Sequence, residues 1–359
     1  MCEISLYTGR HNGGRMQNEL TQSGPLLSSS GDLAQVGWSR QPLLDCNLEA
    51  ARFYTVKPFQ RFRIKRWDYY AVFMPKGFFS VTIADLGYAG NIFVYIMDFE
   101  TGELHEEGLV IPFAKGIDLP RNSTEGSTHF ENNKARLDFS LAVSQRQISV
   151  SWPEFNNGRG IRAELTLTIP NDSESMTIVI PIGTKRFYYN RKINCMPASG
   201  TIQYRDRTET LDPQTCSGSL DWGRGVWEYQ SYWNWASSSG FLADGRTVGL
   251  NLGCGFGDLS KAGENALILE NKLHKLEQVR FDYSSGNYMQ PWKFTDNEGR
   301  LDLIFTPFKE RMAQTNLGII FSEVHQMFGR YNGKAIADNG EVIEIRDLTG
   351  FAEEHHARW

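Results

Sequence analysis

The residues best suited to chemistry are concentrated in two neighbouring segments near the middle of the chain. Residues 221–227 (DWGRGVW) and 232–235 (YWNW) together hold four of the nine tryptophans. Because alternate residues of a strand face the same side, Trp233 and Trp235 are expected to place two indoles next to each other. Such a pair can form a platform for a flat or polyene ligand, or a wall that stabilises a cation. The alternative is that both are core tryptophans that close the base of a barrel.

Asp221 and Arg224 flank a predicted tight glycine turn, for which two interpretations stand. In the first, they form a structural ion pair that holds the loop. In the second, Asp221 lines the mouth of a pocket in which Trp222 and Arg224 contact the ligand. A carboxylic acid inside an apolar, aromatic cavity has its pKa raised, and it can then donate a proton near neutral pH. Tyr232 or Asn251 would in that case orient a water molecule.

Further polar residues in the second half of the chain offer hydrogen bonds to a ligand if their strands turn them inward. They are Glu264, Asn265, His274, His325 and Gln326. The first half has a counterpart in which Trp67 and Tyr70 are candidate ligand contacts. There, three neighbouring cations are available to neutralise Asp68, so that acid is expected to be structural. The site is therefore expected in the second half, at its border with the first.

Motifs for metals and cofactors are weak. The segment 353–356 (EEHH) holds two acids and two histidines, but adjacent strand residues point apart and the histidines lack helical i, i+4 spacing. The sequence contains neither a GxSxG elbow nor a phosphate-binding P-loop. The glycine-rich segment 253–257 is not followed at once by a helix pattern, which argues against a dinucleotide site. We therefore expect no metal and no cofactor.

Composition narrows the classes of partner. The 359 residues are enough for two domains, and the hydrophobic fraction of 40% allows a substantial core. Aromatic residues make up 13% of the chain, which suits broad sheets and pockets for flat or greasy ligands. A net charge of −5 argues against nonspecific binding of nucleic acid. One basic run, 61–66, alternates with apolar residues and is interpreted as a solvated strand face, with anion or headgroup binding as the alternative.

Cysteine usage and hydropathy indicate a reducing compartment. The five cysteines are an odd number without CxxC spacing, which is typical of free, mostly buried thiols. The first residues lack a basic start followed by an apolar stretch, and no apolar run approaches the roughly 18 residues of a membrane helix. We expect a cytoplasmic protein without a transmembrane segment. The sequence does not determine its oligomeric state.

Short strand patterns must position these residues. Apolar or alternating runs separated by glycine turns predict strands, for example at 69–74, 78–84, 91–97, 137–143, 147–152, 161–169 and 176–180. Long helical periodicity is nearly absent. The prediction is an all-β fold with two antiparallel barrel lobes in tandem, packed through an aromatic interface. The expected division is an N-terminal arm at 1–50, a first lobe at 50–195 and a second lobe at 210–359.

Several strings resemble one bacterial family, a domain of unknown function numbered 2804 (DUF2804). They are DWGRGVWEYQSYWNWASSSG, GLNLGCGFGD, ENALILENKLHKLE, PWKF and GFAEEHHARW, together with IKRWDYY, TIADLGYAG and FYYNRKINCMPASG. More distantly, Asp-Trp-Gly followed by Trp-x-Trp and a hairpin is similar to the carotenoid 1,2-hydratase-like group. That resemblance implies two lipocalin-like barrels and a cavity for a terpenoid or other lipophilic substrate. It places Asp221, Trp222, Trp233 and Trp235 at the motif positions of the group.

Three functions follow as hypotheses. The first is a module that binds or carries a lipophilic or partly apolar small molecule in an aromatic-lined pocket. The second is a cofactor-independent hydratase, lyase or isomerase that acts on an alkene, with Asp221 as the acid and the two tryptophans shielding the cation. The third is a structural or stress-related interaction protein without a ligand. Whether Trp233 and Trp235 face a void is the most informative single observation, and an unusually large exposed apolar patch would favour the third hypothesis.

Overall fold

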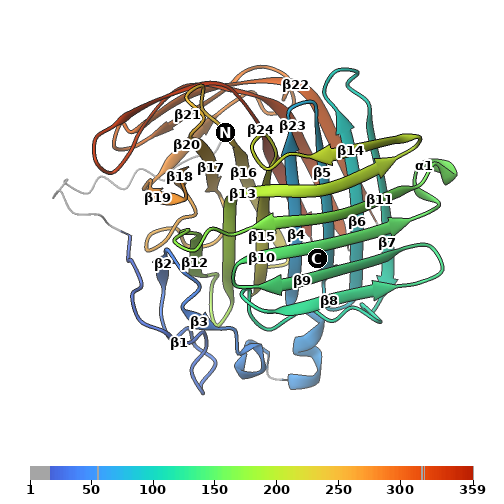
Figure 1. Cartoon of the computed structure of the whole chain (residues 1–359). Helices are drawn as coiled ribbons and strands as arrows, with labels where there is room; N and C mark the ends of the chain where they lie inside the picture. Colours follow the sequence, from blue (N-terminus) through green and yellow to red (C-terminus); the bar gives the residue numbers. More distant parts are fainter. Residues whose placement is uncertain (1–16, 55, 317, 319, 359) are drawn as a thin grey trace.

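Strands account for nearly all regular structure of the chain (Figure 1). The computed structural model describes residues 17–54, 56–316, 318 and 320–358. Within these ranges the helices are α1 (Phe155–Gly158) and the two 3-10 helices η1 (Leu48–Ala50) and η2 (Lys57–Phe62). The predicted all-β class is confirmed. Cys2 and the first sixteen residues of the predicted N-terminal arm lie outside the described residues.

The first sheet is antiparallel and has the strand order β7-β6-β5-β4-β15-β13-β11-β10-β9-β8. Its strands are β4 (Lys65–Met74), β5 (Gly77–Asp85), β6 (Ala89–Asp98), β7 (Leu104–Pro112), β8 (Gly126–Glu131), β9 (Arg136–Ala142), β10 (Gln145–Trp152), β11 (Ile161–Thr168), β13 (Phe187–Tyr204) and β15 (Ser217–Val226). Two further strands pair with β13, namely β12 (Met176–Pro181) and β14 (Arg207–Leu211), and β2 (Gly37–Ser39) pairs with β12. A separate small pair consists of β1 (Gly24–Pro25) and β3 (Leu44–Asp45).

The second sheet is also antiparallel, with the order β19-β18-β17-β16-β24-β23-β22-β21-β20. Its strands are β16 (Gln230–Phe241), β17 (Thr247–Cys254), β18 (Ala266–Leu269), β19 (Lys272–Lys275), β20 (Val279–Asp282), β21 (Trp292–Asp296), β22 (Leu301–Asn316), β23 (Phe321–Ile336) and β24 (Val342–Arg358). Each sheet curls around its own core, so the tandem of two antiparallel lobes is confirmed. Within the described residues, both hydrogen-bonded orders stay open at their ends, and the lobes are half-barrels.

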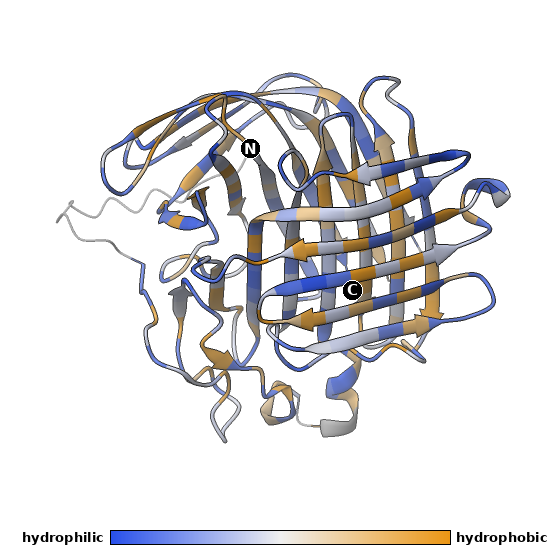
Figure 2. Ribbon diagram, viewed as in Figure 1, coloured by the Kyte–Doolittle hydropathy of each residue, from blue (hydrophilic) through white to orange (hydrophobic). Residues whose placement is uncertain are grey.

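The central strands of the first sheet are buried on both faces. Figure 1 shows β8–β11 crossing in front of β4–β7, and the Tyr70 ring of β4 packs edge-on against Phe139 of β9 at 5.1 Å. The opposite face of β4 carries Tyr69 and Phe73, which pack between the two sheets. Strands covered on both sides have long apolar runs, whereas the outer strands β8–β11 alternate, as the mixed colours of Figure 2 show.

Strand β15 lies in the range predicted for the second lobe, 210–359, yet it is hydrogen bonded between β4 and β13 of the first sheet. The segment 221–225 is therefore extended strand, and the predicted tight turn is wrong. Gly223 makes room for the Trp67 indole, because a Cβ at position 223 would lie 2.0 Å from a carbon of that ring. The second sheet begins at Gln230 with β16. The division into domains otherwise stays a prediction.

The basic run 61–66 is not a solvated strand face. Lys65 is buried and its ammonium donates to the backbone oxygen of Leu86 at 2.8 Å. Arg66 forms an ion pair with Asp85 at 2.5 Å. The run spans the end of η2 and the start of β4, so strand alternation does not govern all of it. No helix among the described residues combines the length and the apolar composition needed to cross a membrane.

Candidate functional site

A cavity of about 440 Å³ lies between the two sheets and is lined by residues from both. Nine aromatic side chains form most of its wall: Trp67, Tyr69, Phe93, Tyr95, Tyr188, Trp227, Trp233, Trp235 and Phe256. The two tryptophans of the predicted platform thus face a void. The cavity also has a limited set of polar groups, which strand register brings together.

Two rows of side chains face each other across this cavity. In the first sheet the row crosses six adjacent strands in register, and its members are Lys192, Asp221, Tyr69, Thr82, Phe93 and Gly108. In the second sheet the row crosses four strands, and its members are Trp235, Glu353, Gln326 and Arg311. Directly opposed residues of neighbouring antiparallel strands share one face. Register therefore gathers residues that lie far apart in the sequence.

Lys192 is the centre of the first polar cluster. Its Nζ lies 2.9 Å from Oδ2 of Asp221 and 3.4 Å from Oε2 of Glu264, and its side chain is 4% exposed. The same ammonium lies 3.9 Å from the centre of the Trp235 ring. Burial lowers the pKa of Lys192, but the two carboxylates outweigh burial and the pKa is raised overall. Lys192 therefore stays charged. Asp221 also accepts a 2.6 Å hydrogen bond from the Asn190 amide.

The predicted ion pair between Asp221 and Arg224 is wrong. The two residues lie three positions apart on one strand, so their side chains face opposite sides. Arg224 instead pairs with Asp68 at 3.0 Å inside the first sheet, where both side chains are fully buried and the guanidinium covers the Trp222 ring at 4.2 Å. Burial raises the pKa of Asp68, against the opposing effect of Arg224. The cation that pairs with Asp68 is thus Arg224 and none of the neighbouring cations of its own segment, since Lys65 and Arg66 bind Leu86 and Asp85.

Glu353 is the centre of the second polar cluster. One carboxyl oxygen accepts from the indole N–H of Trp233 at 3.2 Å, and the other accepts from the Gln326 amide at 2.9 Å. Gln326 in turn accepts from the hydroxyl of Tyr95 at 3.1 Å, and the Tyr95 and Tyr69 hydroxyls lie 3.0 Å apart. Burial raises the pKa of Glu353 to about 7. The carboxyl group is therefore poised between its neutral and charged forms at neutral pH.

A third polar cluster joins the sheets at Arg311 and Glu106. The guanidinium binds the carboxylate through two hydrogen bonds of 2.6 and 2.8 Å, and it covers the Tyr95 ring at 4.4 Å. Nearby, the His355 ring packs against the Trp233 indole, with ring centres 4.0 Å apart and ring planes tilted by 35°. Burial lowers the pKa of His355 to about 3, so this histidine is neutral near physiological pH.

Two polar atoms of the cavity wall have unused hydrogen-bonding capacity. The hydroxyl of Thr82 and the indole N–H of Trp227 are buried, and neither has a hydrogen-bond partner among the described residues. Thr82 belongs to the in-register row of the first sheet, so its side chain points into the cavity. Buried polar groups are normally paired, and an unpaired one in a cavity wall is a candidate ligand contact.

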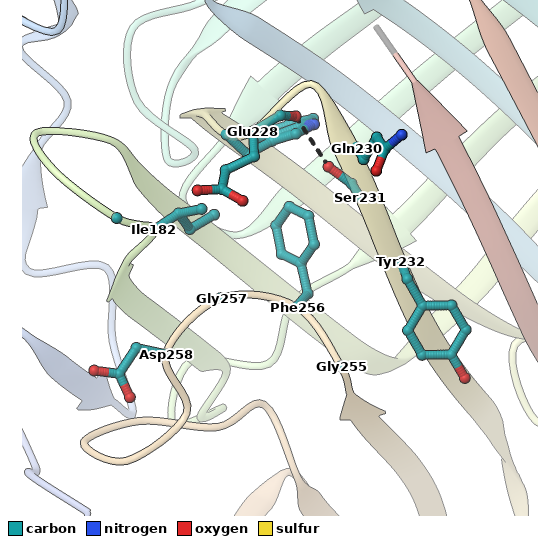
Figure 3. Close-up of a pocket in the computed structure, with 11 residues that line it drawn as sticks. Ile182, Glu228, Gln230, Ser231, Tyr232, Gly255, Phe256, Gly257 and Asp258 are labelled. Atoms are coloured by element: carbon teal, nitrogen blue, oxygen red, sulfur yellow. Dashed lines mark hydrogen bonds between the residues drawn. The ribbon is translucent and has the colours of Figure 1, made fainter. Parts of the chain in front are cut away.

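A second hollow of about 390 Å³ adjoins the cavity and shares Trp227 and Phe256 with it (Figure 3). Figure 3 shows Phe256 rising from its loop towards Glu228. The ring packs against three aromatic neighbours, with ring centres 5.0 Å from Tyr188, 5.3 Å from Trp227 and 5.5 Å from Trp233. The flanking glycines 255 and 257 have φ values of 87° and 72°, a region that residues with a Cβ rarely adopt. We name this hollow the outer groove.

The predicted site residues fall into three groups. Those that line the cavity are Asp221, Glu264, Trp67, Trp233 and Trp235. Asn251 supports it from behind, accepting from the Trp235 indole at 2.8 Å and donating to the backbone of Glu264 at 2.7 Å. The others lie elsewhere. Tyr232 lines the outer groove, and Asn265 binds the backbone of Gly253 in β17 and of Glu277 before β20. Trp222, Arg224 and Tyr70 point into the core of the first sheet.

Sequence reasoning missed Lys192, Glu353, Arg311 and Thr82, whereas Gln326, which was a candidate, does line the cavity. Glu353 belongs to the segment that was examined only for metal ligands, although an acid beside the apolar stretch Gly350–Ala352 is itself a signal of a buried carboxyl group. Lys192 gives a comparable signal, as a charge within a tyrosine-rich strand. Among the residues that the structure describes, no group of three or more His, Cys, Asp or Glu is placed to hold a metal ion.

The fold and the cavity define a class of all-β proteins in which two curled sheets enclose an aromatic pocket. The sequence profile of the family described as domain of unknown function (DUF2804) matches residues 17–359, and the chain belongs to this family. This confirms the resemblance inferred from the motifs.

Solved structures show more distant similarity. An AttH-like protein from Nitrosomonas europaea is 14% identical, with a TM-score of 0.45 over 84% of this chain and 96% of its own. Kievitone hydratase from Nectria haematococca is 10% identical, with a TM-score of 0.44 over 85% of this chain and 92% of its own. No curated protein matches the sequence.

Proposed function

We propose that the protein binds a small molecule with a largely apolar body in the cavity between its sheets. The observation that carries the proposal is an aromatic cavity of about 440 Å³ into which a few polar groups converge. Ligand pockets typically measure about 300–1,000 Å³ and combine apolar walls with a small number of orienting polar groups. The unpaired hydroxyl of Thr82 and the unpaired N–H of Trp227 support it, since a bound ligand can complete their hydrogen bonds.

The outer groove is the proposed route of entry. It meets the cavity at Trp227 and Phe256, and rotation of the Phe256 ring breaks no hydrogen bond that the structure describes. A ligand that enters here passes between two aromatic faces before it reaches Glu353 and Lys192.

Native mass spectrometry of protein purified from its own host tests the proposal. We expect a retained small molecule, and we expect the variant Ala84→Leu, which fills part of the cavity, to retain less of it. Val143→Leu is the control, because Val143 is 67% exposed and lies outside the cavity. Absence of any retained molecule, together with failure to bind apolar fluorescent probes, would contradict the proposal.

A second candidate function is proton transfer to an alkene, and Glu353 is the observation that favours it. A carboxyl group with a pKa of about 7 is a suitable general acid at neutral pH. Its proton would add to one alkene carbon and leave a cation on the other, facing the new carboxylate and the aromatic wall. Water would then add and return a proton to Glu353, or an adjacent C–H bond would lose its proton to the carboxylate. Asp221, paired with Lys192, is not the acid in this scheme.

Deuterium incorporation into terpenoid alkenes in D₂O tests this candidate. Glu353→Gln is expected to abolish incorporation and to retain ligand binding. Asp221→Asn serves as the comparison, and it is expected to keep measurable incorporation. Loss of incorporation in Asp221→Asn alone would return the acid role to Asp221.

A further inference from the structure

The charges of the cavity wall do not balance. Its ionisable side chains other than tyrosine and the neutral His355 are four acids and two bases, namely Glu106, Asp221, Glu264, Glu353, Lys192 and Arg311. Lys192 is shared by Asp221 and Glu264, and Arg311 is bound by Glu106. No cation among the described residues forms an ion pair with Glu353, which has only the neutral donors Trp233 and Gln326.

A cation supplied from outside would complete this arrangement. A buried carboxylate is costly unless an opposite charge pairs with it, and aromatic ring faces attract cations. Glu353 lies in the row that also carries Trp235, and its partner Trp233 presents an indole to the same cavity. On the opposite wall, the unpaired hydroxyl of Thr82 offers an oxygen acceptor for an N–H or polarised C–H group.

We infer that the cavity is selective for organic cations, with an alkylated ammonium group beside Glu353 and the apolar body of the ligand along the aromatic wall. This inference rests on the proposed binding function and names its ligand class. The surplus acid, the aromatic wall and the unpaired hydroxyl are three separate features that such a ligand satisfies at once.

A matched pair of probes tests the charge directly. (Naphthalen-2-ylmethyl)trimethylammonium and its neutral carbon isostere, 2-neopentylnaphthalene, have nearly the same shape and differ in charge. Equilibrium dialysis at pH 8 is expected to show at least tenfold tighter binding of the cation by the intact protein. Glu353→Gln is expected to weaken binding of the cation at least tenfold and to leave the neutral probe within twofold.

Glu354→Gln is the matched control. Glu354 is the next residue of β24, points to the opposite face and is hydrogen bonded to Tyr288 and His356. This variant is expected to leave the affinities of both probes within twofold of the wild type, because its carboxyl group does not line the cavity.

The pH dependence adds an independent measurement, because the quaternary probe carries no titratable proton. Its affinity is expected to rise about tenfold between pH 6 and pH 8 as Glu353 ionises, and that of the neutral probe to stay constant. The other titratable and charged groups that face Glu353 in the cavity wall are Arg311, Lys192, Asp221, Glu264, Glu106, His355, Tyr69 and Tyr95. Glu353→Gln should remove the pH dependence while all of these remain.

The outcomes separate the two proposals. Equal binding of the two probes, or tighter binding of the neutral one, would overturn cation selectivity and leave the binding function standing. Binding of neither probe would count against the binding function and cation selectivity together. Equal weakening in Glu353→Gln and Glu354→Gln would show that the loss is structural, and it would overturn the role of Glu353.

Discussion

Replacing Lys192 with methionine would leave two carboxylates in the cavity wall without their cation. Methionine is unbranched and of similar length, so the variant mainly removes charge. The Lys192 side chain is 4% exposed, and those of Asp221 and Glu264 are 11% and 15% exposed. Solvent therefore provides little compensation for the lost ammonium group.

The expected loss of stability is about 3–5 kcal/mol, the usual cost of removing one partner from a buried ion pair. The lower end applies here, because Asn190 still donates to Asp221 and both carboxylates retain some contact with water. The lost contact between the ammonium and the Trp235 ring adds about 1 kcal/mol. The working value is thus about 3–4 kcal/mol.

Urea denaturation at pH 7 measures this difference. Lys334→Met is the matched control, since Lys334 is 62% exposed and forms an ion pair with Glu344 at 3.1 Å. Exposed pairs contribute about 0–1 kcal/mol, so this variant should be nearly as stable as the wild type. Adding Asp221→Asn to Lys192→Met is expected to restore more than half of the loss, because it removes one of the uncompensated charges.

The pH dependence has a definite sign. The folded protein raises the pKa of Lys192 above the ordinary value of 10.5. Its stabilising effect is therefore fully present below that value and is lost as the pH rises through the higher folded pKa. The gap between wild type and Lys192→Met should close in alkali. If Lys192→Met is no less stable than Lys334→Met at pH 7, the ammonium does not hold this cluster together.

Four further predictions concern single side chains. Glu353→Gln should be as stable as the wild type at pH 4 and more stable by on the order of 3 kcal/mol at pH 8. The reason is that the raised pKa of about 7 makes the folded wild type lose stability as the pH rises from 4.5 to 7. Urea denaturation that gives the variant and the wild type equal stability at both pH values would argue against it. Thr82→Val should raise stability by about 1 kcal/mol and weaken ligand retention, since it removes an unpaired buried hydroxyl. Thermal denaturation measures the stability and native mass spectrometry the retention, and a less stable variant would show that the hydroxyl has a partner. Arg224→Met should lower the free energy of unfolding by about 3–5 kcal/mol, because it leaves Asp68 buried and unpaired. Adding Asp68→Asn should restore much of that stability in the same urea assay. No recovery would mean that packing of Arg224 on Trp222 dominates. Phe256→Ala should speed ligand exchange in stopped-flow tryptophan fluorescence, and unchanged rates would place the entry route elsewhere.

Local patterns in the sequence were sufficient for the fold class and for part of the site. Period-two alternation and glycine turns depend on neighbouring residues, so they predicted the strands of β9, β10 and β11 and the all-β class. The same alternation placed Trp233 and Trp235 on one face, and the structure puts both in the cavity wall. The motifs also identified the family.

Only the tertiary structure decided which strands are neighbours, and with them the partners of each charge. Asp221 meets Lys192 because β13 and β15 pair in one register, and a shift of a single residue would turn one of the two side chains into the opposite core. Glu106 meets Arg311 across 205 positions of sequence, through contact between the two sheets. Pairing of distant strands depends on the packing of whole sheets, and no local pattern encodes it. For that reason the sequence indicated an aromatic pocket, whereas the register of two sheets determined that Glu353 is the acid in it that forms no ion pair with any described residue.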